Sequence, residues 1–348
     1  LTSTNSSIGL IYALKKIFIM FAIYVDASHK IGLGHLNRCL RLSKEISRSK
    51  KKIIILTQSV KVKKLFETKN VQILNINRLS KQKIFKYLDK KKVKVIIFDI
   101  VKKNYLINSL ASNKENTLFK VLIADDNVKL IKTNLTFFPF IGNKKYSKYE
   151  YGGKKYCVLE KMPIKKKVKK IKSVLISMGG SDPKNLSLLV AKKLINLNCE
   201  LNIVLGKLSK LQIKDFDFLK NRELKHKVYK HQDTLKDLMY FNDLLITNNG
   251  ITKYEASYMR MPSLIVSQEK KANKFQKIFS KDNNSIFLGH YRNKKVKNLN
   301  KFITRLINNS SKLKKLQDIK SNFDSYGAKR ILSKINFYLN QYEKKNFY

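Results

Sequence analysis

The stretch FAIYVDASHKIGLGHLNRC, residues 21–39, decides the fold class of this chain. Its first five residues are apolar and form a short run of the kind that makes a buried strand. The glycines Gly32 and Gly34 follow, and an amphipathic pattern then continues from Leu36 to Ser47. A buried strand, a glycine-rich turn and a helix in this order begin a parallel α/β domain, with the turn at the carboxyl end of the strand.

The same alternation recurs outward along the chain. Further strands are predicted at Lys52–Thr57, Val93–Phe98, Val121–Ala124, Ser173–Ser177, Leu201–Leu205, Asp243–Thr247 and Ser263–Val266. Helical patterns separate them at Ile84–Lys91, Asn185–Leu197 and Thr252–Met259. Strands rich in Ile, Val and Leu that alternate with helices indicate parallel sheets covered on both faces. We therefore expect an α/β fold of two Rossmann-like, doubly wound domains that face a cleft.

A cationic break divides the two sets of strands. The segment 161–172 contains Pro163 and the run Lys165–Lys170, which we interpret as an interdomain linker. The N-terminal domain is then expected over residues 20–160, and the C-terminal domain with the final helices over residues 173–348. In open parallel sheets, ligands bind beyond the carboxyl ends of the strands, so the site is expected between the domains.

The N-terminal residues 1–19 are expected to be an extension outside the fold. Lys15 and Lys16 precede the apolar run Ile17–Val25, a pattern that a signal peptide also shows. The run is too short to span a bilayer, which needs about 20 apolar residues. Met20 stands where a first strand of this kind normally begins a protein. An extension is favoured, with a signal peptide as the alternative, and no transmembrane segment is expected.

The net charge is extreme but does not by itself indicate a function. The 348 residues include 74 Lys and Arg against 24 Asp and Glu, which gives +50. Such a charge attracts nucleic acid, anionic lipid or phosphorylated substrates. Lysine nevertheless occurs along the whole chain while arginine is scarce, and recognition sites favour arginine. We interpret most of the charge as solvated surface, and we expect no nucleic-acid partner because the sequence lacks the motifs of the common nucleic-acid-binding modules.

The cysteines and histidines indicate neither a disulfide framework nor a metal site. Cys39, Cys157 and Cys199 are odd in number and have no C-x-x-C spacing, and no H-E-x-x-H pair occurs. A reducing cytoplasm fits this cysteine usage. No metal and no other cofactor is expected.

The first motif that carries chemistry runs from Asp26 to Cys39. Gly32 and Gly34 permit a tight turn and a close approach of ligand to backbone, and the helix that follows offers free N–H groups to an anion. His35 lies at the helix start, where a neutral imidazole can act as a general base. A purely structural turn is the alternative. Because Asp26, Gly32, Gly34, His35 and Arg38 occur together after a strand, we predict that they belong to the site.

The second motif, Ser177–Asn185, follows the first strand of the second half. Gly179 and Gly180 stand at the strand end, and Ser or Asp then precedes a helical pattern. Such a loop suits a phosphate or a sugar at a capped helix. An ordinary capped turn fits this pattern equally well.

The third motif, Thr247–Ala256, joins a strand end to a helix through small residues. Backbone donors at that helix start suit a diphosphate, and a carboxylate one turn further along suits ribose hydroxyls. The predicted binding residues here are Asn249, Gly250, Ile251, Thr252 and Glu255. Gln268 and Asn273 follow the next strand and are candidates to contact sugar hydroxyls. The alternatives are that Glu255 only complements the helix dipole and that Gln268 and Asn273 are solvated.

Together the three motifs resemble the UDP-2,4-diacetamido-2,4,6-trideoxy-β-L-altropyranose hydrolases of the pseudaminic-acid pathway. Asp125 and Asp126 also fit that pattern, and the resemblance covers residues from about Phe21 to about Gly289. It implies the two-domain glycosyltransferase-B fold and cleavage of the sugar–UDP bond by water, with inversion and without metal. It also implies that His35 is the active-site histidine, that the second half holds UDP, and that Glu255 lies at the ribose.

The chain departs from the family pattern at two positions. The family has Tyr-Gly shortly after the Asp that matches Asp99, where this chain has Ile-Val-Lys. The family has an Arg where this chain has Glu160. Tyr105 and nearby lysines are the candidates to supply the phenol and the cation.

The leading hypothesis is a cytoplasmic nucleotide-sugar hydrolase whose UDP-sugar substrate leads to a pseudaminic-acid-like nonulosonate. The alternative enzyme is a glycosyltransferase of the same fold, in which a sugar hydroxyl replaces water. A nucleotide-sugar-binding protein that has lost catalysis is a third hypothesis, and a nucleic-acid-binding protein, suggested by charge alone, is a fourth. The sequence holds no signal for an oligomeric state.

Overall fold

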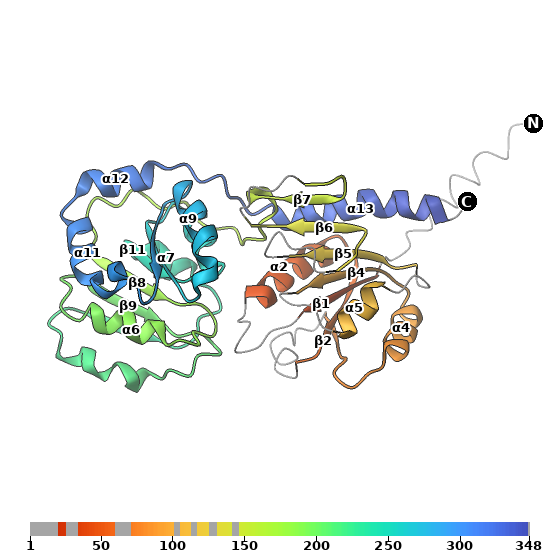
Figure 1. The fold of residues 1–348 in the computed structure, drawn as a ribbon, viewed down its shortest axis with the longest axis horizontal. Coiled ribbons are helices and arrows are strands. Elements are labelled where there is room, and N and C mark those ends of the chain that lie inside the picture. Colours follow the sequence, from red (N-terminus) through yellow and green to blue (C-terminus); the bar gives the residue numbers. More distant parts are fainter. Residues whose placement is uncertain are drawn as a thin grey trace, which may run out of the picture.

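Two parallel α/β domains lie side by side in the computed structural model (Figure 1). The structure describes residues 20–25, 34–59, 71–100, 105–112, 117–124, 131–140 and 146–346. The expected extension 1–19 lies outside these residues. The expected architecture of two Rossmann-like domains is confirmed.

The first domain is built on a seven-stranded sheet in the order β3-β2-β1-β4-β5-β6-β7, with every neighbouring pair parallel. Its strands are β1 (Met20–Val25), β2 (Lys52–Thr57), β3 (Gln72–Asn75), β4 (Val93–Asp99), β5 (Phe119–Ile123), β6 (Leu135–Phe138) and β7 (Glu150–Gly152). Its helices are α2 (Gly34–Arg48), α4 (Lys81–Lys90) and α5 (Tyr105–Ser112), and the short 3-10 turn η1 (Lys154–Tyr156) follows β7.

The side chains of alternate residues in each central strand are buried on opposite faces of the sheet, since successive side chains in a strand point to opposite faces. In β1, Phe21 and Ile23 pack in one core with α2, whereas Ala22 and Tyr24 pack in the other with α4 and α5. Both faces of the sheet are therefore covered, which explains why β1 is apolar at every position rather than at every second one.

The second domain is built on a six-stranded parallel sheet in the order β10-β9-β8-β11-β12-β13. Its strands are β8 (Ser173–Ser177), β9 (Glu200–Val204), β10 (His226–Tyr229), β11 (Leu244–Thr247), β12 (Ser263–Ser267) and β13 (Ser285–His290). Its helices are α6 (Leu186–Lys193), α7 (Lys236–Phe241), α8 (Thr252–Met259), α9 (Asn273–Lys281), α10 (Lys294–Lys297), α11 (Leu299–Ile307) and α12 (Ser310–Asp318), with 3-10 turns η2 (Ile213–Asn221) and η3 (Lys270–Ala272).

The last helix, α13 (Gly327–Asn346), returns to the first domain (Figure 1). Its residues Ile331, Ile335 and Leu339 are buried in the same core as β1 and α2. The helix begins at Gly327, where a Cβ would overlap the backbone carbonyl of Cys157. The end of the chain thus fastens to the first domain through a contact that only glycine permits.

Within the described ranges, no helix combines the length and the apolar character needed to cross a bilayer. The same ranges contain no cluster of three His, Cys, Asp or Glu side chains arranged to hold a metal ion.

A test of the second domain follows from Gly206, which comes soon after β9. A Cβ at Gly206 would overlap the backbone of Gly179 and Gly180, so Gly206→Ala must displace that loop. We expect the substitution to lower the free energy of unfolding by about 1–3 kcal/mol, the usual cost of forcing atoms into a packed site. Urea unfolding followed by circular dichroism measures it. An unchanged midpoint would show that the loop yields freely.

Candidate active site

The two domains present their loops where the strand order of each sheet reverses. In the first sheet β1 lies between β2 and β4, and in the second β8 lies between β9 and β11. Loops that follow the two strands at such a point diverge, which opens space for a ligand at the carboxyl ends of the strands. All three sequence motifs follow β1, β8 or β11. The topology therefore places the start of α2 and the loops after β8 and β11 at the carboxyl edges of their sheets.

In the first domain, the start of α2 meets the end of β4 in a buried charged cluster. His35 Nδ1 lies 2.5 Å from Asp99 Oδ1, and Arg38 donates to both oxygens of the same carboxylate, at 2.6 Å and 2.7 Å. Asp99 is fully buried, and Arg38 and His35 are 3% and 7% exposed. The spacing of three residues places His35 and Arg38 on one face of α2, so that both reach the strand beside β1.

The position of one proton follows from these distances. Arg38 Nη2 lies 2.9 Å from His35 Nδ1 as well as 2.6 Å from Asp99 Oδ1. A contact of 2.5 Å between Nδ1 and a carboxylate oxygen requires a proton between them, and the guanidinium can donate to the carboxylate instead of the ring. His35 therefore carries a proton on Nδ1 that it donates to Asp99. In the neutral ring this tautomer places the basic lone pair on Nε2.

Asp99 remains ionised despite complete burial. Burial by itself raises the pKa of this carboxyl group, but the charge of Arg38 and the hydrogen bonds from Arg38 and His35 outweigh it and hold the pKa below its usual value. Cys39 lies next to the same carboxylate, with Sγ 3.4 Å from Oδ2. Burial and the neighbouring negative charge raise the pKa of this thiol well above its usual value. Cys39 is a protonated packing residue and not a nucleophile.

In the second domain, the loop after β8 contains a capped helix start. Asp182 accepts hydrogen bonds at 2.8 Å from the backbone N–H groups of Leu186 and Ser187, and it is 2% exposed. This geometry gives Asp182 the structural role that the sequence left open for this motif, and it explains why α6 begins at Leu186. Gly179 has φ +81°, a conformation that favours glycine.

The loop after β11 contacts the loop after β8 through Asn248. The Asn248 side chain donates to the carbonyl of Met178 and accepts from the N–H of Gly250 at 2.8 Å. This side chain fixes Gly179, Gly250 and the start of α8 as one surface. Since α8 begins directly after it at Thr252, the backbone N–H groups of the helix face that surface.

Several polar atoms near this surface are buried without a hydrogen-bond partner in the described part of the chain. They are Thr247 Oγ1, Asn249 Oδ1 and Asn273 Oδ1. Thr247 ends β11, Asn249 donates to Ser267 Oγ at the end of β12, and Asn273 begins α9. A buried polar atom without a partner is costly unless a ligand or water supplies one. A polar ligand or water at these strand ends would satisfy all three atoms.

Glu255, on the first turn of α8, forms an ion pair that joins the two domains. Its Oε1 accepts a hydrogen bond from Arg41 Nη2 of α2 at 2.6 Å. Arg41 also donates to the carbonyl of Val158 at 3.3 Å and lies 3.9 Å from Glu160 Oε2. A cation thus occupies the vicinity of Glu160, and α2 supplies it. Tyr105, the candidate for the missing phenol, is 91% exposed on α5.

The remaining predicted residues have the following places. Gly180 and Ile251 lie in the loops after β8 and β11, and Gln268 follows β12 as a half-buried residue. Asp26 and Gly32 lie outside the described residues. Two charged residues of the candidate site, Asp99 and Arg41, were not among the predicted site residues. An Asp at the end of a buried strand was a usable signal for the first, whereas Arg41 is one more basic residue on a helix.

Comparison with known proteins places this geometry in a known architecture. No protein-family model matches the chain. The uncharacterized protein MJ1062 of Methanocaldococcus jannaschii is 30% identical over 275 residues, which is 71% of this chain and 55% of that protein. This chain therefore spans about half the length of its curated relative.

Solved structures match over nearly the whole chain. MurG of Acinetobacter baumannii superposes with a TM-score of 0.67 at 13% identity, covering 91% of this chain and 99% of that one. The chain has the glycosyltransferase-B fold. MnaA of S. aureus, solved with UDP, superposes with a TM-score of 0.59 at 13% identity, covering 92% of this chain and 97% of that one. At such identities the likeness establishes the fold and nothing finer.

Gly34, the first residue of α2, offers a test that separates stability from ligand binding. A Cβ at Gly34 meets no heavy atom within 4 Å in the described ranges. Alanine also favours a helix over glycine by up to about 1 kcal/mol. We expect Gly34→Ala to leave the urea midpoint unchanged or slightly raised, yet to raise the KM for a sugar nucleotide about tenfold, because the methyl group occupies space that a ligand approaches. An unchanged KM would remove Gly34 from the site.

Proposed function

We propose that this chain cleaves UDP from a UDP-linked 2,4-diacetamido-2,4,6-trideoxyhexose of the altrose type, by attack of water on the anomeric carbon. The observation that carries the proposal is the buried pair of His35 and Asp99 at the strand-order reversal of the first sheet. A histidine whose ring is oriented by a buried carboxylate is a frequent arrangement for a general base. The resemblance of the three sequence motifs to such hydrolases supports the choice of substrate.

The second domain would hold the nucleotide. The start of α8 suits the diphosphate, since a helix start carries a partial positive charge. The unpartnered Thr247 Oγ1, Asn249 Oδ1 and Asn273 Oδ1 suit the polar groups of a bound ligand. Glu255 suits the ribose hydroxyls, and its present partner Arg41 then becomes available to the diphosphate. The UDP-bound MnaA of S. aureus, which shares the fold, supports a UDP site.

In the proposed reaction these residues act as follows. His35 Nε2 accepts a proton from water as the water oxygen forms a bond to the anomeric carbon. The bond between that carbon and the UDP oxygen breaks, and its electron pair stays on the departing diphosphate. The products are the free sugar, with inverted configuration, and UDP. Helix N–H groups and the Arg41 guanidinium stabilise the charge that develops on the leaving oxygen.

The deciding experiment is phosphorus NMR of the full chain with the UDP-linked diacetamido-trideoxy-altrose in ¹⁸O-enriched water. We expect UDP to form without any acceptor and the label to appear in the sugar, since the attack is at carbon. Label in the phosphate would overturn the mechanism. If the UDP-sugar binds but UDP forms only when an acceptor sugar is added, the hydrolase proposal fails and a glycosyltransferase takes its place. Binding without release under either condition would indicate a protein that has lost catalysis.

A further inference from the structure

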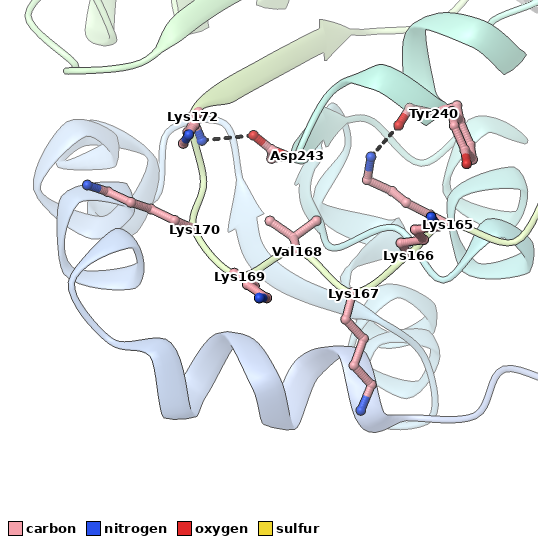
Figure 2. Close-up of a pocket in the computed structure, with 9 residues that line it drawn as sticks. All are labelled: Lys165, Lys166, Lys167, Val168, Lys169, Lys170, Lys172, Tyr240 and Asp243. Atoms are coloured by element: carbon pink, nitrogen blue, oxygen red, sulfur yellow. Dashed lines mark hydrogen bonds between the residues drawn. The ribbon is translucent and has the colours of Figure 1, made fainter.

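A second feature of the molecule lies away from the candidate active site, on the segment that joins the domains. We call it the linker patch and define it as residues 164–172 with Tyr240 and Phe241. The segment borders a cavity of about 370 Å³, lined by Lys165, Lys166, Lys167, Val168, Lys169, Lys170, Lys172, Tyr240 and Asp243 (Figure 2). His35, Arg38 and Asp99 are not part of it.

The backbone of the linker patch is firmly held, so its lysines form an array with fixed backbone positions. Val168 is buried, and its N–H and carbonyl group both bond to the Gln317 side chain of α12, at 2.6 Å and 2.9 Å. The N–H of Lys165 donates to the carbonyl of Met259 at 2.8 Å. Side chains on both sides of Val168 are therefore directed outward, and Figure 2 shows Lys167 and Lys170 extending away from the segment.

Positive charge dominates this array. Six of the nine lining residues are lysines. Two carboxylates contact the segment in the described ranges: Asp243, which accepts from the backbone N–H groups of Lys172 and Ser173, and Asp318, which pairs with Lys167. Lysines 166, 169 and 170 are exposed. The patch is accordingly complementary to a surface of closely spaced negative charges.

Apolar side chains project from the same place. Phe241 is 76% exposed and Ile164 is 49% exposed. The Phe241 ring packs edge-to-face on Tyr240, with centroids 5.4 Å apart, and the Tyr240 ring lies 5.7 Å from Lys165 Nζ. A solvated lysine face would not need a phenylalanine and an isoleucine in water beside it. Exposed apolar residues within a basic rim mark an interaction surface.

We propose that the linker patch docks the protein on the surface of an anionic lipid bilayer. The lysines would lie against the lipid phosphates while Phe241 and Ile164 enter the boundary of the acyl chains, the arrangement that suits an interfacial segment. Nucleic acid is the less suitable partner, since its sites favour arginine and stacked aromatic rings, and an isoleucine has no stacking face. This inference does not rest on the proposed activity.

Fluorescence tests whether Phe241 enters the bilayer. The chain contains no tryptophan, so Phe241→Trp introduces a single reporter. Vesicles of phosphatidylcholine alone are compared with vesicles that also contain phosphatidylglycerol. We expect a blue shift of emission with the anionic vesicles only. The matched control is Phe337→Trp, because Phe337 is 55% exposed on α13 with Lys334 Nζ 5.9 Å from its ring. Equal shifts at both positions, or none at Phe241, would overturn the proposal.

Sedimentation with the same vesicles tests the lysines. Each lysine near an anionic surface changes affinity about fivefold, so we expect Lys166→Gln with Lys169→Gln to weaken binding at least about tenfold. The control pair is Lys225→Gln with Lys227→Gln, which removes the same charge at a separate cavity, of about 470 Å³, on the edge of the second sheet. Equal losses for both pairs would show that only net charge acts.

A last experiment distinguishes a lipid bilayer from nucleic acid as the partner of the linker patch. Phe241→Ser should weaken vesicle binding and leave the binding of polyuridylate unchanged. If the patch lysines govern polyuridylate binding and Phe241→Ser leaves vesicle binding intact, the surface belongs to nucleic acid and the bilayer proposal fails. All the variants are made at exposed side chains, and thermal unfolding by circular dichroism confirms that each remains folded.

Discussion

Asp99→Asn is expected to lower turnover by about 10³- to 10⁴-fold, the loss typical when the carboxylate behind a catalytic histidine is replaced by its amide. The physical reason is the proton between His35 Nδ1 and Asp99 Oδ1, which lie 2.5 Å apart. An amide NH₂ at that position donates instead of accepting, so the ring takes the other tautomer and its basic lone pair leaves Nε2. Phosphorus NMR of UDP release measures the effect, and KM should change little because Asp99 lies behind the ring.

The same substitution has a second expected effect, on stability. Arg38 is 3% exposed and donates twice to Asp99, so loss of the negative charge leaves a buried guanidinium without its counterion. Breaking a buried ion pair by removing one partner costs about 3–5 kcal/mol. The free energy of unfolding in urea reports this cost, and residual turnover is compared only under conditions in which the variant is folded.

Acid unfolding gives the third readout of Asp99, with a sign set by its lowered pKa. The ionised carboxylate stabilises the fold at pH above its unfolded pKa of about 3.9, and that contribution is lost as the pH falls through the lower folded value. The stability gap between the native chain and Asp99→Asn should narrow below about pH 4. The control is Asp243→Asn, whose partners are Ser173 and backbone N–H groups. The turnover of Asp243→Asn should equal that of the native chain. If Asp99→Asn also kept native turnover, a role for Asp99 in positioning His35 would be excluded.

The central strands of both sheets were predictable from sequence because they are buried on both faces. The predicted runs Lys52–Thr57 and Ser173–Ser177 match β2 and β8, and the predicted helix Thr252–Met259 matches α8. Such strands are apolar on both faces along most of their length, so a continuous apolar run identifies them. The first residue after each run then locates the carboxyl edge of the sheet, which is why the loops at that edge could be named without a structure.

The outer strands were not predicted, since they have a weaker signal. β3 (Gln72–Asn75) and β7 (Glu150–Gly152) are the outer strands of the first sheet, and none of their residues is fully buried. β10 (His226–Tyr229) has the same place in the second sheet. An edge strand is half solvated and short, so its composition resembles that of a loop. These strands form by pairing with a neighbour, which no local pattern encodes.

The interaction partners of the candidate site residues also could not be predicted from the sequence. Asp99 is 64 residues from His35, and Glu255 is 214 residues from Arg41. Each contact depends on which strands are neighbours and on how α2 and α8 approach one another. A motif lists the groups that a ligand needs, but the tertiary fold decides which charge faces which. The ion pair of Glu255 with Arg41 therefore adds a condition that the motif did not contain: any ligand that uses this carboxylate must compete with an arginine for it.

His35→Gln is expected to lower turnover by about 10²- to 10⁴-fold, the usual contribution of a positioned general base, while UDP binding by titration calorimetry stays unchanged. The separation follows from the fold, because His35 belongs to the first domain and the proposed nucleotide surface to the second. His231→Gln is the control, since His231 pairs with Asp233 on an exposed loop of the second domain. Parallel loss of UDP binding and turnover would contradict a role in the chemical step.

Combining His35→Gln with Asp99→Asn completes the test of how the two residues act. If Asp99 works only by orienting the ring of His35, then replacing it in a chain that already lacks the ring should lower turnover no further. Two residues that act as one unit show this failure of additivity, whereas independent sites multiply their losses. If the double variant and His35→Gln alone have the same turnover, Asp99 acts only through His35. A further loss of tenfold or more in the double variant would instead assign Asp99 a contact of its own with the substrate, and Arg38, which donates to the same carboxylate, would then be the next residue to vary.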